Sequence, residues 1–252
     1  MTAPIGIQLY TVRDAMNEDF TATVTKIAEM GYVGVETAGF PGTTPEGAAK
    51  LFAKLGLQVS SAHSPLPVGD NKNQVLDAMA ALSTKRLVCP ALMRDKFDTI
   101  DGIKEVCDVL NEAVAVCNAN DLQLGYHNHW WEYLTVEGTP ANQVMLENLD
   151  SSIYFELDTY WIQVGGQSPV ETITSLGERA PLLHIKDGPA TNDGDMTAVG
   201  SGVIDVPAII AAGKEHAEWL IVELDRCATD MMEAVQESYT YLVGEGLARG
   251  NR

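Results

Sequence analysis

The strongest constraint on the fold is a regular alternation of short apolar runs with segments of helical spacing. The apolar runs lie at 5–9, 33–36, 57–62, 86–89, 122–126, 153–157, 182–185 and 220–224. Helical patterns lie at 19–32, 45–55, 72–83, 98–119, 139–149, 169–178, 206–213 and 230–247. Strands that are apolar on both faces and alternate with helices are typical of parallel sheets. The pattern therefore predicts an α/β protein with a parallel sheet.

The number of units favours a closed barrel over an open sheet. Eight strand–helix units in 252 residues fit one (β/α)8 TIM barrel domain that spans residues 1–252. A doubly wound open sheet is the alternative. That fold expects a glycine-rich phosphate loop after its first strand. Here the first run is followed by Tyr10, Thr11 and Arg13.

The charge and the chain's N-terminal region exclude several classes of protein. Acidic residues number 35 and basic residues 16, for a net charge of −19, which disfavours electrostatic binding of nucleic acid. No run of apolar residues is long enough to span a membrane. The chain enters its first apolar run at Ile5 without a basic or leader-like segment. We therefore expect a cytoplasmic protein that acts on a small molecule.

Ionisable side chains, with a few other polar and aromatic ones, gather where the predicted strands end. In a (β/α)8 barrel the carboxyl ends of the strands form the catalytic face. Isolated charges at the ends of apolar strands are costly to bury unless they are paired or bind a cation. These strand-end residues are Gln8, Tyr10, Glu36, His63, His127, His129, Glu132, Asp158, Trp161, His184, Lys186, Asp187, Glu223 and Asp225.

Three of these residues form the basis of a predicted metal site. Asp158, His184 and Glu223 end neighbouring strands and supply two carboxylates and an imidazole. A fourth ligand is needed from the fifth strand, and Glu132 is our candidate. A carboxylate-rich set with one histidine suits Mn²⁺ best, with Mg²⁺ or Co²⁺ as alternatives.

A series of ordered motifs is shared with a known family. The motifs are GIQLYTVRD, GYVGVE, YHNHWWEY, ELDTYW, HIKD, VGSGVID and VELD, which together extend over nearly the whole chain. With them the chain resembles the sugar phosphate isomerase/epimerase family, which has a xylose isomerase-like TIM barrel. The family includes ketose 3-epimerases and inosose dehydratases.

The resemblance implies a divalent ion held by Glu, Asp, His and Glu from strands five to eight. Asp158, His184 and Glu223 fall on matching motifs. The usual strand-five glutamate position falls on His127, with Glu132 five residues later. Either Glu132 reaches the ion, or His127 or His129 binds it and Glu132 contacts substrate; we take Glu132 as the ligand. Ketose epimerases of the family also carry a histidine where this chain has Trp161.

The resemblance and the residues together predict a metal-dependent sugar isomerase or epimerase. Such an enzyme would remove a proton next to a carbonyl and pass through an enediolate. We predict that Glu132, Glu223, His127 and His129 are catalytic. We predict that Gln8, Tyr10, His63, Trp131, Trp161 and Lys186 bind the substrate.

Two other activities remain open at this point. A lyase or hydratase would eliminate a group from a 3-keto-sugar, a 3-keto-glycoside or a keto-inositol, using the same first proton transfer. A zinc endonuclease on the same barrel is a remote alternative, because five histidines and a charge of −19 suit it poorly. A homo-oligomer is compatible with the sequence.

Overall fold

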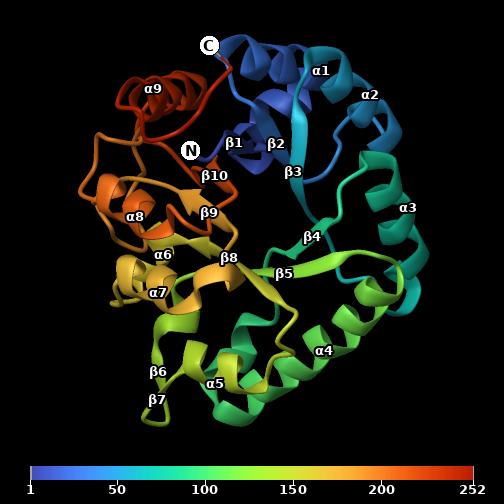
Figure 1. The fold of residues 1–252 in the computed structure, drawn as a ribbon, viewed down its shortest axis with the longest axis vertical. Coiled ribbons are helices and arrows are strands. Elements are labelled where there is room, and N and C mark those ends of the chain that lie inside the picture. The colour runs from blue at the N-terminus through green and yellow to red at the C-terminus, as the bar shows by residue number, and fades with distance from the viewer. Residues whose placement is uncertain (1, 252) are drawn as a thin grey trace.

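The strands form a closed parallel barrel. The computed structural model describes residues 2–251, in which eight strands pair in the order β1-β10-β9-β8-β5-β4-β3-β2 (Figure 1). The barrel closes because β1 also pairs with β2, with Gln8 beside Glu36. The barrel strands are β1 (Ile5–Gln8), β2 (Gly34–Thr37), β3 (Gln58–His63), β4 (Arg86–Cys89), β5 (Gln123–His127), β8 (Tyr154–Asp158), β9 (Leu182–Ile185) and β10 (Trp219–Val222). The predicted (β/α)8 fold is confirmed.

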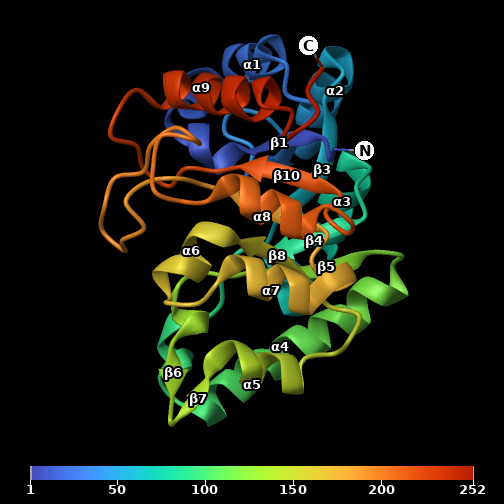
Figure 2. The ribbon, with the colours of Figure 1, turned by 60° about the vertical axis from the view of Figure 1, so that its left-hand side comes forward.

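The helices surround the strands, as both ribbon views show (Figures 1 and 2). They are α1 (Arg13–Met30), α2 (Pro45–Leu55), α3 (Lys72–Leu82), α4 (Ile100–Ala119), α5 (Ala141–Asn148), α6 (Thr159–Val164), α7 (Pro169–Leu176), α8 (Val206–Gly213) and α9 (Met231–Gly244). Short 3-10 turns lie at Leu9–Val12, Gly69–Asn71, Arg94–Asp98, Trp131–Tyr133 and Gly177–Arg179.

Local sequence signals explain where many helices begin and end. The side chains of Thr44 and Ser168 accept hydrogen bonds from the backbone at the starts of α2 and α7, and a proline follows each cap. Asp205 and Asp230 cap α8 and α9 in the same way. Helix α1 ends at Gly31, which has a φ of 108°, a conformation that favours glycine.

The structure differs from the predicted elements in several places. Helix α1 begins at Arg13, six residues before the predicted helix, and Asp19 inside it has non-helical backbone angles. Helix α6 and a small hairpin of β6 (Thr135–Val136) and β7 (Thr139–Pro140) were not expected. Strand β10 ends at Val222, so Glu223 lies just beyond the strand and not within it. This shift keeps Glu223 at the carboxyl end of the barrel.

The two ends of the described chain lie together at the amino side of the barrel. The backbone N–H of Arg249 donates to the carbonyl of Ala3 at 2.9 Å, and Pro4 and Arg249 form a parallel bridge. On the same side, the buried ring of Trp219 packs against Gly6 and Gly34. Within the described residues, no helix combines the length and apolar character that crossing a membrane requires.

Candidate active site

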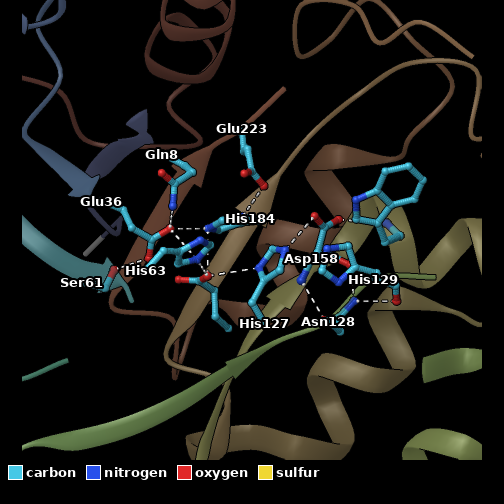
Figure 3. Close-up of polar contacts among 12 residues, drawn as sticks. Gln8, Glu36, Ser61, His63, His127, Asn128, His129, Asp158, His184 and Glu223 are labelled. Atoms are coloured by element: carbon cyan, nitrogen blue, oxygen red, sulfur yellow. Dashed lines mark hydrogen bonds and ion pairs between the residues drawn. The ribbon is translucent and has the colours of Figure 1, made fainter. Parts of the chain in front are cut away.

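Four buried side chains meet at the carboxyl end of the barrel. His127 ends β5, Asp158 ends β8, His184 lies in β9, and Glu223 follows β10 (Figure 3). Each offers one ligand atom, and these four atoms lie within 4.8 Å of one another. We call these four residues the outer set. The distance from His127 Nε2 to Asp158 Oδ2 is 3.7 Å, and that from His184 Nδ1 to Glu223 Oε2 is 2.8 Å.

The outer set contains three of the four predicted metal ligands. Asp158, His184 and Glu223 are brought together as the sequence predicted, and the fourth member is His127. Two carboxylates and two imidazoles form a donor set that fits a divalent first-row metal ion.

Glu132 lies outside both groups of possible ligands found among residues 2–251. Its carboxylate accepts a hydrogen bond from the Tyr126 hydroxyl at 2.7 Å and another from the backbone N–H of His129 at 2.8 Å. The side chain is buried, so both bonds are shielded from water. In this arrangement Glu132 holds the loop after β5 in place, and its assignment as a metal ligand stays a prediction.

Lys186 places a positive charge beside the outer set. Its Nζ atom lies 2.8 Å from Asp158 Oδ2, 2.7 Å from Glu223 Oε2 and 2.7 Å from Asp225 Oδ2. Burial alone would lower the pKa of Lys186, but these three carboxylates raise it well above its ordinary value. Lys186 is therefore held as an ammonium ion.

Burial and the nearby charges together set the pKa values of Asp158 and Glu223. Burial, which lowers the stability of the charged form, raises the pKa of Asp158 to about 6. For Glu223 burial acts in the same direction, but Lys186 and His184 outweigh it and hold its pKa well below the ordinary value. Glu223 is therefore ionised near neutral pH.

A second group of polar residues lies one layer deeper in the barrel. Glu156 is two residues before Asp158 on β8, so both side chains point inward. Its Oε2 atom lies 2.6 Å from His63 Nε2, 3.1 Å from His127 Nδ1 and 3.2 Å from His184 Nε2. We call His63, His127, Glu156 and His184 the inner set; their ligand atoms also lie within 4.8 Å of one another.

Glu36 borders the inner set from β2. It accepts hydrogen bonds from Gln8 Nε2 at 2.6 Å, from the Ser61 hydroxyl, and from His184 Nε2 at 2.8 Å (Figure 3). Burial raises the pKa of Glu36 to about 7, and the nearby Glu156 adds to this effect. Gln8, predicted to bind substrate, is fully buried and bonds to Glu36 instead of lining the cavity above.

The three histidines of the inner set differ in their pKa. Burial lowers the pKa of all three. Glu36 and Glu156 overcome this effect at His63 and raise its pKa, whereas the pKa of His127 stays well below its ordinary value. At His184 the carboxylates of Glu156, Glu223 and Glu36 raise the pKa well above it.

A cavity of about 490 Å³ opens above these residues. The residues with polar groups that line it are Tyr10, His63, Ser64, His127, His129, Glu223 and Asp225. The apolar residues include Ala38, Pro65, Leu66, Cys89, Pro90, Ala91 and Leu92. Its size falls within the range of small-molecule sites.

The two predicted substrate-binding tryptophans lie outside that lining. The Trp131 ring stacks on His129 with ring centroids 4.1 Å apart, so it supports a cavity residue from behind. Trp161 is buried, and the Lys186 ammonium lies 5.6 Å from its ring centroid. Lys186 also lies outside the lining, below Glu223 and Asp225.

The sequence reasoning missed Glu156 and Ser61 and gave Glu36 no role. Glu156 was read as part of an apolar strand, because a single acidic residue interrupts the run IYFEL. The signal that identifies it is the alternation in Glu-Leu-Asp, which places Glu156 and Asp158 on the same face of β8.

The chain is similar in structure to several solved proteins. A sugar phosphate isomerase/epimerase from Parabacteroides distasonis is 26% identical, with a TM-score of 0.83, and the match covers 99% of this chain and 96% of that one. An L-ribulose 3-epimerase is 17% identical, with a TM-score of 0.69 and coverage of 97% and 94%. A probable 3-DHS dehydratase from Bacillus anthracis is 14% identical, with a TM-score of 0.76 and coverage of 95% and 98%.

At 17% and 14% identity, the similarity to the epimerase and to the dehydratase shows a shared fold alone. None of the curated proteins is similar enough to the chain to count as a match. The model of one protein family, described as a xylose isomerase-like TIM barrel, matches residues 24–242, which is most of the chain. The chain therefore belongs to the xylose isomerase-like TIM barrel family.

Proposed function

We propose that the chain is a divalent-metal-dependent isomerase or epimerase that acts on a sugar. The single observation that carries this proposal is the outer set, in which two imidazoles and two carboxylates converge below a cavity of about 490 Å³. His127, Asp158, His184 and Glu223 would hold the ion, for which Mn²⁺ is our first choice and Co²⁺ or Mg²⁺ the alternatives. A bound divalent ion polarises a carbonyl oxygen and stabilises the negative charge that forms there.

Glu223 is the residue best placed to accept the proton. It lines the cavity, and Lys186 and His184 keep it ionised. Removal of a proton from the carbon next to a carbonyl requires such a base within reach of the C–H bond. Lys186, bonded to both Glu223 and Asp225, fixes the orientation of the carboxylate.

His129 is the second proton-transfer group. Its ring also lines the cavity, and stacking on Trp131 fixes the plane of that ring. Return of the proton to the opposite face of the same carbon gives epimerisation, and return to the neighbouring carbon gives isomerisation. Because Glu132 bonds to Tyr126 and to the backbone of His129, it contributes by positioning His129.

The names of the similar proteins support a sugar as the substrate. The relative at 26% identity is called a sugar phosphate isomerase/epimerase, and another is called an L-ribulose 3-epimerase. The residues that line the cavity include no lysine or arginine, so they favour an unphosphorylated sugar.

Hydrogen exchange tests this proposal. The Mn²⁺-loaded protein is incubated in D₂O with ketoses, 3-keto-glucosides and keto-inositols, the metal is then removed, and the products are analysed by NMR. We expect deuterium at one carbon-bound position with the carbon skeleton retained. Glu223→Gln should slow this exchange by at least about 100-fold, the lower range of a general-base contribution.

The matched control is Glu237→Gln, which makes the same change at an exposed position of α9. A sample without enzyme corrects for the spontaneous exchange of 3-keto-sugars. Exchange that is equal in the wild type and in Glu223→Gln would contradict the assigned base. No exchange with any member of the panel would contradict isomerisation or epimerisation of these sugars.

One observation favours elimination as the second candidate function. His63 lines the same cavity, and two buried carboxylates hold its pKa above the ordinary value, which suits an acid beside a leaving group. In the same experiment, loss of an aglycone or of water together with deuterium incorporation would assign a lyase.

A further inference from the structure

We propose that the inner set is a zinc-type metal position, distinct from the outer set. Its donors are His63 Nε2, His127 Nδ1, His184 Nε2 and Glu156 Oε2, which come from β3, β5, β9 and β8. The cation it would take is a divalent first-row ion that prefers imidazole, with Zn²⁺ as the first candidate. The inference concerns where an ion binds, so it stands whether or not the proposed sugar chemistry is correct.

The spacing of the donors is the first argument. In a tetrahedral site with metal–ligand distances of about 2.0–2.1 Å, the ligand atoms lie roughly 3.3 Å from one another. Three imidazole nitrogens surround Glu156 Oε2 at 2.6, 3.1 and 3.2 Å, and all four donor atoms lie within 4.8 Å of one another. The His63 nitrogen, at 2.6 Å, would have to move outward for an ion to enter.

The charge of the inner set is the second argument. Glu36 and Glu156 are both fully buried, and their ion pairs within residues 2–251 are with histidines. The outer set has the ammonium ion of Lys186, whereas no lysine or arginine among residues 2–251 pairs with the inner carboxylates. Within the same residues, Glu156 Oε1 is buried without a hydrogen-bond partner. Buried carboxylates in this state gain stability from a bound cation.

His63 distinguishes an inner metal position from a simpler role, in which the inner carboxylates only orient the histidines of the outer set. A carboxylate that only orients a metal-bound histidine accepts one N–H from that ring. Glu156 and Glu36 already face His127 Nδ1 and His184 Nε2 in this manner. Orientation of the outer ligands therefore needs no third imidazole, yet His63 Nε2 lies 2.6 Å from the same Glu156 oxygen and 3.2 Å from Glu36 Oε1.

The two sets share His127 and His184 through opposite ring nitrogens. His127 presents Nε2 to Asp158 and Nδ1 to Glu156, and His184 presents Nδ1 to Glu223 and Nε2 to Glu156. A neutral imidazole has one nitrogen free to bind a metal. Ions in the two sets therefore compete, and ligand type decides between them: three imidazoles favour Zn²⁺ in the inner set, and two carboxylates favour Mn²⁺ in the outer set.

Direct location of the ion is the first test. Crystals of the wild-type protein soaked with Zn²⁺ would be measured at the zinc absorption edge. We expect an anomalous peak between His63 and Glu156. A peak between Asp158 and Glu223, or no peak at either set, would overturn the proposal.

Affinity in solution is the second test, with Zn²⁺ titrated into metal-free protein. We expect Glu156→Gln and His63→Gln to weaken Zn²⁺ binding by more than about 100-fold, which exceeds the 10–100-fold cost of losing an outer partner. Asp158→Asn should change it by less than tenfold, and His216→Gln, at an exposed histidine, should leave it unchanged. Circular dichroism of the metal-free variants identifies any that fail to fold. If Asp158→Asn abolishes Zn²⁺ binding while folded Glu156→Gln and His63→Gln retain it, the inner set is not a metal position.

Discussion

At the scale of single residues, the fifth strand shows why residue type does not fix a ligand. His127 and Glu132 are five positions apart, and both were plausible ligands in the sequence. The structure directs the His127 ring into the barrel and turns Glu132 toward Tyr126 and the backbone of His129. The difference depends on the 3-10 turn at Trp131–Tyr133, which the sequence did not reveal.

The role of Glu132 gives the first prediction. Glu132→Gln replaces an acceptor of the His129 N–H with an amide that can also present a donor, so the loop after β5 should shift. We expect the metal content to stay within twofold of the wild type and the rate of hydrogen exchange to fall by roughly 10–100-fold, as misplacement of a reacting group does. Metal analysis after dialysis and the D₂O assay measure these two quantities separately.

The result distinguishes positioning from metal binding. If Glu132 is a ligand, the variant should lose its metal along with its activity. Glu137→Gln, in the β6–β7 turn, is the matched control because it changes a nearby exposed glutamate.

At the scale of elements, the loop between β9 and α8 is organised around one buried carboxylate. Asp187 accepts hydrogen bonds from the backbone N–H groups of Gly188, Gly200, Gly202 and Ile204, at 2.8–3.1 Å. The loop closes on itself through these bonds, and Arg226 Nε joins it to the segment after β10 by donating to the carbonyl of Gly194.

The second prediction follows from this arrangement. Asp187→Ala leaves four backbone donors without their acceptor, and buried donors cost about 1–3 kcal/mol each when unsatisfied. Since water can reach part of the opened loop, we expect the free energy of unfolding to fall by about 3 kcal/mol. Urea denaturation measures the change. Asp193→Ala, at an exposed position of the same loop, should change it by less than about 0.5 kcal/mol; an equal loss in both variants would show that Asp187 does not hold the loop.

Most of the fold was predictable at this scale because strands and helices leave periodic signals. Each barrel strand lies within two residues of its predicted bounds. The hairpin was missed because its turn is Glu137-Gly138, with φ values of 51° and 85°, and Glu-Gly is a weaker signal for such a turn than Asn-Gly. Helix α6 was missed because its six residues are too short for helical periodicity to show.

The candidate site was predictable only in part, for a different reason. Asp158, His184 and Glu223 each end an apolar strand, and such isolated charges stand out in the sequence. Glu156 acquires its significance from His127, a partner 29 residues away in the chain, and from the register of β5 with β8, where the two residues pair. Sequence periodicity carries no information on that register.

At the scale of the whole molecule, the barrel brings the outer set together from β5, β8, β9 and the segment after β10. These four segments are separated widely in sequence, so their side chains converge only in the closed barrel. An ion held by them would bind the folded state and not the unfolded chain, and its binding free energy would therefore add to the stability of the fold.

The last prediction measures this coupling. At a Mn²⁺ concentration 100 times the Kd, binding should add about 2.7 kcal/mol to the free energy of unfolding. For a domain of this size, roughly 2–4 °C per kcal/mol corresponds to a rise in Tm of about 5–11 °C. Asp158→Asn should abolish most of the rise, whereas Asp193→Asn, an exposed control, should retain it. A rise of the same size in Asp158→Asn would mean that the ion stabilises the barrel from another position, since the outer set would then have lost one of its two carboxylates without effect.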